Sequence, residues 1–131
     1  MENLPKNTVG QMFEAFRKGD NEGVVDTVSE DSLWVYHGTQ VIPPSSFEGK
    51  DGVRKFFTRI LKGTEVLKFE TDEFIIEGNK VVVLGNEHQR VRKSGKELKQ
   101  KWVQIYTVEN NLITKMEEFA TSEVITVKPS K

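Results

Sequence analysis

The sequence has 131 residues, a net charge of −1 and no cysteine, which suits one domain with a core of its own. Without cysteine it can form neither disulfides nor thiolate sites, and its 19 basic and 20 acidic residues are interspersed, unlike the basic clusters of nucleic-acid-binding proteins. No segment approaches the roughly 20 apolar residues of a membrane span. We therefore expect one domain over 1–131, with its core over about 8–126, in a cytoplasmic protein that binds neither membranes nor nucleic acid.

Helical signals come first in the chain. Apolar residues spaced as i, i+3, i+4 and i+7 predict a helix over about 8–18, with Thr8 as its cap. Asp20 can cap a second helix that ends near 29–31. A third helix is expected over about 51–63, where apolar residues again repeat at helical spacing.

Strand signals dominate the rest of the chain. Aromatic and β-branched residues predict a strand over 33–37, and 38–49 is expected to be a loop because it contains consecutive prolines. Hydrophobic, β-rich segments then follow one another, separated by short turns of Gly, Asn and Ser that favour tight hairpins. They predict a four-stranded antiparallel meander over about 65–77, 80–93, 96–109 and 112–126. Helices followed by a long curled sheet indicate a half-open cone with a pocket inside.

Three motifs carry a resemblance to a known family. They are FRKGD at 16–20, FEGKDGVRKFF at 47–57, and WVQIYTV followed by LITKMEEF over 102–119. With this order of elements the chain resembles the nuclear transport factor 2-like superfamily, and within it the SnoaL-like, ketosteroid-isomerase-related branch. The resemblance implies a cone-shaped α+β fold in which three N-terminal helices pack on a strongly curved antiparallel sheet. It also implies an internal hydrophobic pocket and a homodimer formed through the sheet.

The resemblance also bears on catalysis. Ketosteroid isomerases use a tyrosine, a base aspartate and a second acid, and these roles fall here on Met12, Tyr36 and Gln104. Met12 cannot donate a hydrogen bond, and Tyr36 is a poor base at neutral pH because the reference pKa of tyrosine is near 10. Gln104 can donate a hydrogen bond but is never a neutral acid. Steroid isomerisation by that mechanism is therefore not expected.

Strand alternation predicts which side chains share the pocket face. Pairing about a turn at 94–95 places Trp102 opposite Glu87 and Gln104 opposite Gly85, and all of these lie on one face. Glu87 is then either an acid of the pocket or, like most glutamates on strands, a charge that faces solvent.

The last strand leaves two registers open. A regular ladder brings Glu117 and Phe119 to the pocket face, whereas a bulge brings Met116 and Glu118 there. A carboxylate inside an apolar cone would have a raised pKa and could act as a base near neutral pH.

Aromatic walls with a few polar groups suit a small hydrophobic organic molecule with one or two polar atoms. The ligand-binding candidates are Met12, Trp34, Tyr36, Trp102, Gln104 and Phe119. The catalytic candidates are Tyr36, His37, Glu87 and Glu118. His37 is the best general acid or base among them, although a position at the end of a strand also fits a role at the pocket rim. The two histidines have no metal-ligand spacing and no glycine-rich phosphate loop is present, so neither a metal nor a cofactor is expected.

Three functions remain open at this point. The first is a SnoaL-like small-molecule-binding protein without chemistry of its own. The second is a cofactor-independent isomerase, dehydratase or cyclase that acts by proton transfer on a small organic substrate. The third is a dimeric interaction module that uses the alternate, apolar face of the sheet, with Val103, Ile105 and Thr107.

Overall fold

The computed structural model describes residues 4–40 and 42–125, with the side chains of 123–125 left out. Its elements in chain order are α1 (Pro5–Arg17), α2 (Asn21–Val25), β1 (Val28–Tyr36), β2 (Ser45–Glu48), α3 (Gly49–Gly63), β3 (Thr64–Glu77), β4 (Lys80–Val91), β5 (Glu97–Glu109) and β6 (Leu112–Ile125). The expected α+β fold is confirmed, and the four long strands lie close to their predicted bounds. The predicted ends of the domain and Thr126 lie outside the described residues.

The helix boundaries differ from the predicted ones at α1. This helix begins at Pro5, because proline is well suited to a first helical turn, and Leu4 precedes it without a side-chain cap. The prediction that Thr8 caps the helix was wrong. Thr8 lies inside α1, where its hydroxyl donates a hydrogen bond to the carbonyl oxygen of Asn111 at 3.3 Å.

The cap of α2 was predicted correctly and its end was not. Asp20 accepts a hydrogen bond from the backbone N–H of Gly23 through its carboxylate, at 2.9 Å. The helix ends at Val25 and not near 29–31, because Val28 already belongs to β1 and pairs with Ile113 of β6. Of the three valines in this segment, Val24 and Val25 therefore belong to a helix and Val28 to a strand.

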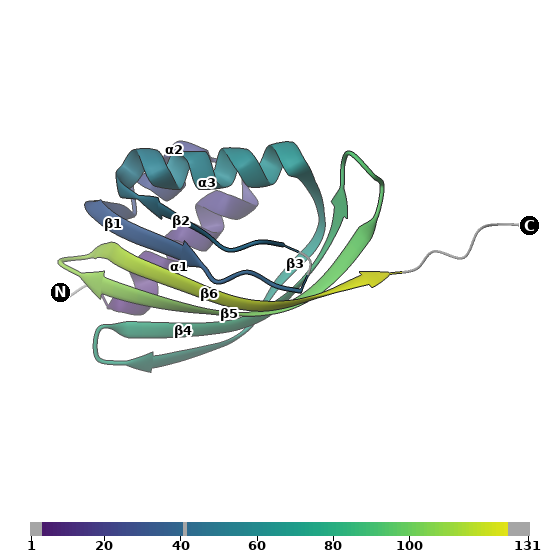
Figure 1. Cartoon of the computed structure of the whole chain (residues 1–131). Helices are drawn as coiled ribbons and strands as arrows, with labels where there is room; N and C mark the ends of the chain where they lie inside the picture. The colour runs from purple at the N-terminus through teal and green to yellow at the C-terminus, as the bar shows by residue number, and fades with distance from the viewer. Residues whose placement is uncertain (1–3, 41, 126–131) are drawn as a thin grey trace, which may run out of the picture.

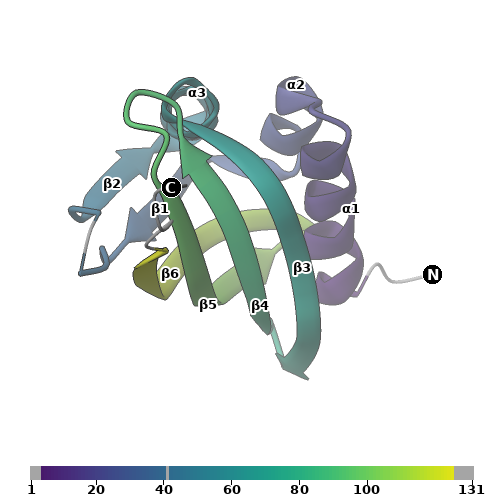
Figure 2. The same cartoon turned by 90° about the vertical axis from the view of Figure 1, so that its right-hand side faces the viewer.

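All six strands form one sheet in the order β2-β1-β6-β5-β4-β3. The sheet is mixed rather than purely antiparallel, because β1 and β6 run parallel while the other neighbouring strands run antiparallel. Strand β2 was missed, since its four residues directly follow Pro43 and Pro44 and pair only with β1. Figures 1 and 2 show the three helices on the same side of this sheet. The strong curvature implied by the resemblance stays a prediction.

Strand register decides which side chains face the helices. Trp102 of β5 lies opposite Gly85 of β4, not opposite Glu87 as predicted. The register between these two strands thus differs from the predicted one by two residues. A shift of two keeps every side chain on its predicted face. The ladder between β5 and β6 shifts between Thr107 and Val108.

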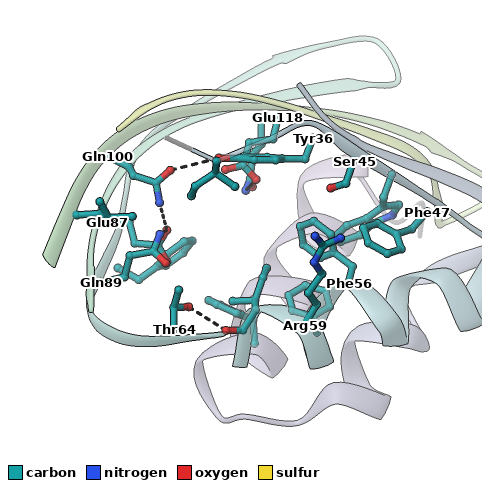
Figure 3. Close-up of a pocket in the computed structure, with 18 of the residues that line it drawn as sticks. Tyr36, Ser45, Phe47, Phe56, Arg59, Thr64, Glu87, Gln89, Gln100 and Glu118 are labelled. Atoms are coloured by element: carbon teal, nitrogen blue, oxygen red, sulfur yellow. Dashed lines mark hydrogen bonds between the residues drawn. The ribbon is translucent and has the colours of Figure 1, made fainter. Parts of the chain in front are cut away.

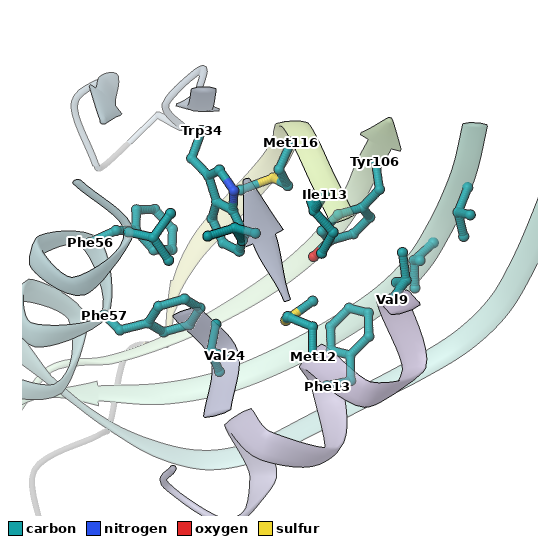
Figure 4. Close-up of a cluster of buried hydrophobic side chains, with 14 of the residues drawn as sticks. Val9, Met12, Phe13, Val24, Trp34, Phe56, Phe57, Tyr106, Ile113 and Met116 are labelled. Carbon is teal, nitrogen blue, oxygen red and sulfur yellow. The ribbon is translucent and has the colours of Figure 1, made fainter. Parts of the chain in front are cut away.

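Between the helices and the sheet lies the hydrophobic core (Figure 4). Phe13 of α1 meets Tyr106 of β5 edge to face at 5.9 Å, and Trp34 of β1 meets Phe57 of α3 in the same way at 5.6 Å. Burying each of these large side chains contributes about 2 kcal/mol. Helices and sheet are thus held together by aromatic contacts.

Candidate functional site

A cavity of about 420 Å³ opens between the helices and the inner face of the sheet (Figure 3). Most of its wall is apolar and comes from all layers of the fold. Its lining includes Met12, Phe13 and Phe16 of α1, Trp34 and Tyr36 of β1, Phe47 of β2, and Phe56, Phe57 and Ile60 of α3. The loop between β1 and β2 adds Ile42 and Pro43. Such a wall excludes water from most of an organic molecule held inside it.

Two glutamates bring carboxyl groups into this apolar space. The first, Glu87 of β4, accepts hydrogen bonds from the side-chain amides of Gln89 at 3.1 Å and Gln100 at 3.3 Å. The carbonyl oxygen of the Gln100 side chain accepts in turn from the hydroxyls of Ser122 at 3.2 Å and Tyr36 at 3.5 Å. Both hydrogen-bond donors to the Glu87 carboxyl are therefore neutral amides.

The second carboxyl belongs to Glu118 of β6. It accepts a hydrogen bond from the Gln104 side-chain amide at 3.0 Å, and the Gln104 carbonyl oxygen accepts from the Tyr106 hydroxyl at 2.5 Å. Because the buried Tyr106 hydroxyl needs an acceptor, this chain fixes the Gln104 amide with its N–H groups toward Glu118. Among the described residues, no basic side chain forms an ion pair with Glu87 or Glu118.

Burial makes both acids weak. Loss of hydration raises the pKa of Glu87 to about 8, and the nearby Glu118 carboxylate adds to this rise. Loss of hydration also raises the pKa of Glu118 to about 7, although the hydrogen bond from Gln104 lowers it in part. Each of the two carboxyl groups therefore changes its protonation state near neutral pH.

Tyr36 stands beside these acids as a neutral donor. Burial raises the pKa of its phenol well above the usual value, and the Glu118 carboxylate adds to the rise. Tyr36 and Glu118 are paired residues of β1 and β6, so their side chains leave the sheet on the same face. A hydroxyl donor and an ionisable carboxyl thus face one cavity.

Comparisons with known proteins place this chain in a family. Residues 9–116 match the family model of the SnoaL-like domain. The chain belongs to the SnoaL-like family. No curated protein sequence matches it.

Solved structures of nuclear transport factor 2-like (NTF2-like) proteins share the fold of this chain. An NTF2-like protein from Burkholderia xenovorans LB400 has 23% identity and a TM-score of 0.79, with 88% of each chain covered. An NTF2-like protein of unknown function from Burkholderia pseudomallei K96243 has 26% identity and a TM-score of 0.77, with 91% of each covered. A computationally designed 17-OHP binder has 19% identity and a TM-score of 0.75, and the match covers 92% of this chain and all (100%) of the binder.

Most of the expected site residues lie on the cavity wall of this SnoaL-like protein. Met12, Tyr36 and Gln104, on which the ketosteroid isomerase roles fall, all line it, as does Trp34. Glu118 lines it too, because the ladder shift before Val108 places Met116 and Glu118, rather than Glu117 and Phe119, on the inner face.

Trp102 was expected in the pocket wall and lies in the core instead. Its indole is 2% exposed, is stacked on Phe69 at 5.2 Å, and covers Gly85 of the neighbouring strand. A Cβ atom at Gly85 would lie 2.1 Å from the indole ring, so the missing side chain provides the space that Trp102 fills. Trp102 packs against Phe13 and Phe69, which line the cavity.

His37 and Phe119 lie outside the cavity, on the opposite face of the sheet. The two rings stack at 4.2 Å, and His37 Nε2 lies 3.1 Å from a carboxylate oxygen of Glu117. Phe119 is 46% exposed. The expectation that Phe119 lines the pocket therefore fails, because the regular register on which it rested is replaced by the shifted one.

Gln100 and Arg59 also line the cavity and were missed from the sequence. Gln100 lies on the same face of β5 as Trp102 and Gln104, because every second residue of a strand shares a face. The correct register, in which Glu87 lies opposite Gln100, would have shown that these two residues are neighbours. No sequence signal distinguished Arg59 from the other basic residues of α3. Among the described residues, no group of three or more His, Asp and Glu could hold a metal ion.

Proposed function

We propose that this SnoaL-like protein binds a small, largely apolar organic molecule in its cavity. The observation that carries the proposal is an aromatic cavity of about 420 Å³ with its polar groups confined to a few positions. Ligand sites in proteins combine these two features in the same size range. The designed 17-OHP binder, which shares the fold, supports the use of such a cavity for an organic ligand.

The polar groups give the ligand its orientation. Glu87, Glu118 and Tyr36 offer hydrogen bonds to one or two polar atoms, while rings such as Trp34 and Phe56 contact the apolar remainder. The expected ligand-binding set is therefore Met12, Trp34, Tyr36 and Gln104, joined by Glu87 and Glu118. Trp102 and Phe119 are left out because of where they lie.

The test uses N-phenyl-1-naphthylamine, a neutral apolar fluorophore, with two variants of β2. Ser45 lines the cavity and its neighbour Ser46 is exposed on the other face, so Ser45→Trp fills the cavity and Ser46→Trp does not. We expect the wild type and Ser46→Trp to bind the dye with equal affinity, and Ser45→Trp to lose at least roughly tenfold. Equal binding by all three proteins would refute the proposal.

A second function, proton-transfer catalysis without a cofactor, is favoured by one specific arrangement. Glu118 has a pKa of about 7 and faces the same cavity as the neutral Tyr36 hydroxyl. In this alternative the Glu118 carboxylate removes a proton from an acidic C–H group and Tyr36 donates a hydrogen bond to the oxygen that gains charge. Glu87 stands as a second acid, and His37 takes no part.

Exchange of the α-protons of 2-tetralone in deuterium oxide, followed by NMR, tests this alternative. We expect the wild type to accelerate exchange and Glu118→Gln to lose roughly a hundredfold or more, since one positioned base contributes that much. His37→Gln, changed on the opposite face, should retain the wild-type rate. Acceleration that survives in Glu118→Gln would rule out this residue as the base.

We also propose a homodimer formed through the outer face of the sheet. Leu84, Val103 and Phe119 lie in one row across β4, β5 and β6, and Phe119 is 46% exposed. A large exposed aromatic ring beside further apolar residues is typical of an interface between subunits.

In the part of the chain that the structure describes, none of the helices has the length and apolar character of a membrane span. A cytoplasmic location stays a prediction from the lack of cysteine.

A further inference from the structure

A second hollow lies along α3, next to the cavity. Its charged lining residues are all basic, and we call it the basic groove. It is lined by Phe47, Arg54, Lys55, Thr58, Arg59, Lys62, Gly63 and Lys93. A groove with five basic and no acidic side chains is notable in a protein whose net charge is −1. The fold therefore gathers positive charge that is interspersed in the sequence.

Two elements bring these residues together. Lys55, Arg59 and Lys62 follow one another at i, i+4 and i+7 and share one face of α3. The turn between β4 and β5 docks on the end of this helix, because the backbone N–H and the Nε of Arg92 donate to carbonyl oxygens in its last turn at 3.0 and 3.1 Å. Lys93 is held beside α3 by these contacts.

The positive charge of the groove is largely uncompensated. Arg54 is bound by the carboxylates of Glu22 and Asp51. The other four basic residues of the groove form no ion pair with any residue that the structure describes; these are Lys55, Arg59, Lys62 and Lys93. They are available to a ligand.

The groove lies directly beside the cavity, since Phe47 and Arg59 line both. In Figure 3, Arg59 and Phe47 lie on the side of the cavity away from Glu87 and Gln100. The cavity thus has carboxyl groups on one side and a guanidinium group on the other. An anion inside it would be repelled from the glutamates and attracted to Arg59 and the groove.

We infer that the ligand of the cavity carries an anionic group, such as a carboxylate, sulfonate or phosphate, which binds in the basic groove while its apolar body fills the cavity. This inference rests on the proposed function, because it needs an apolar body inside the cavity. It narrows the ligand to an amphipathic organic anion and gives it one orientation. The uncharged end meets Glu87, Glu118 and Tyr36, and the anionic end meets Arg59 and Lys93.

Two fluorescent probes with the same aromatic body separate the two parts of this inference. N-Phenyl-1-naphthylamine is neutral, and 1-anilinonaphthalene-8-sulfonate adds one sulfonate to it. We expect the wild type to bind the sulfonate more tightly than the neutral dye, with a preference that decreases as salt is added. Lys62 and Lys93 line the groove but not the cavity. Removing these two cations in Lys62→Gln/Lys93→Gln should lower the affinity for the sulfonate by roughly three- to tenfold and leave that for the neutral dye within about twofold.

The control is Lys18→Gln/Lys101→Gln, which removes the same charge at exposed positions that line neither the groove nor the cavity. It should behave as the wild type. Equal affinity of both probes, or a sulfonate preference that survives the groove variant, would overturn the inference while the neutral dye still reports on the proposed function. Sulfonate binding that survives Ser45→Trp and is lost in the groove variant would assign the groove to a separate anionic partner and also overturn it. Neutral-dye binding that Ser45→Trp leaves unchanged would refute the proposed function and this inference together.

Discussion

Tyr36 of β1 and Glu118 of β6 are partners in a parallel ladder, and both side chains enter the cavity. The neighbouring strand β5 contributes Gln104, whose side-chain amide donates a hydrogen bond to Glu118 at 3.0 Å. A phenol that stays protonated therefore stands beside a carboxyl group that ionises near neutral pH. Three neighbouring strands therefore define the chemistry at this end of the cavity.

Replacing the buried acids should change how stability depends on pH. The folded protein holds protons on Glu87 and Glu118 up to about pH 8 and 7, whereas glutamates of an unfolded chain titrate near 4.3. The unfolded chain thus binds fewer protons, so stability falls as pH rises from about 5 to about 8. In Glu87→Gln/Glu118→Gln this loss should shrink by at least about 2 kcal/mol, because each unit of pKa difference between the folded and unfolded protein corresponds to about 1.4 kcal/mol.

Urea unfolding measured at pH steps between about 5 and 9 checks this expectation. The control is Glu73→Gln, at an exposed position of β3, which should retain the wild-type pH profile. A double variant with the same slope as the wild type would show that the two carboxyl groups do not retain their protons on folding.

The Gln104 amide should tune the acidity of Glu118. Its hydrogen bond favours the ionised carboxylate and lowers the Glu118 pKa, while burial raises it to about 7. Gln104→Leu removes this donor, so the Glu118 pKa should rise further, by roughly 0.5 to 1 unit. Carbon-13 NMR titration of the glutamate carboxyl groups measures it, with Gln11→Leu on the exposed face of α1 as the control. A lowered Glu118 pKa in Gln104→Leu would contradict this role.

Much of the fold could be predicted because its signals are local. Helical spacing of apolar residues located α1 and α3, and turns of Gly and Asn located the long hairpins. Strand β2 and the parallel pairing of β1 with β6 depend on contacts between distant segments, so local patterns did not reveal them.

The site was harder to predict than the fold, because it depends on register. A bulge before Val108 reverses the side on which Glu118 and Phe119 lie, and the sequence allowed both registers. Trp102 was expected to line the cavity because strand alternation places it on the inner face of the sheet. Alternation does not show whether a side chain on that face lines the cavity or is buried in the core. Trp102 fits into the core because Gly85, which has no side chain, lies opposite it in the ladder between β4 and β5. If the two strands were shifted by two residues, as predicted, another residue would lie opposite Trp102.

The contact of Trp102 with Gly85 should make this glycine hard to replace. In Gly85→Ala the added methyl group would collide with the indole and with the Glu70 carbonyl oxygen, 2.3 Å away. Overpacking of this kind costs about 2 kcal/mol. Gly10→Ala is the matched control, because nothing lies within 4 Å of its Cβ position in α1 and alanine favours a helix by up to about 1 kcal/mol. Thermal unfolding should give a lower Tm for the first variant and an equal or higher one for the second.

The proposed dimer should depend on Phe119. This ring is exposed on the outer face of the sheet and is stacked on His37, within a row that includes Val103. A charge placed there would have to be buried without a partner in the interface, so Phe119→Lys should weaken association at least roughly tenfold. Leu61→Lys is the control, because Leu61 is similarly exposed, at 40%, but lies on α3. Sedimentation equilibrium at micromolar concentration should find dimers for the wild type and Leu61→Lys and monomers for Phe119→Lys, and a monomeric wild type would refute the dimer.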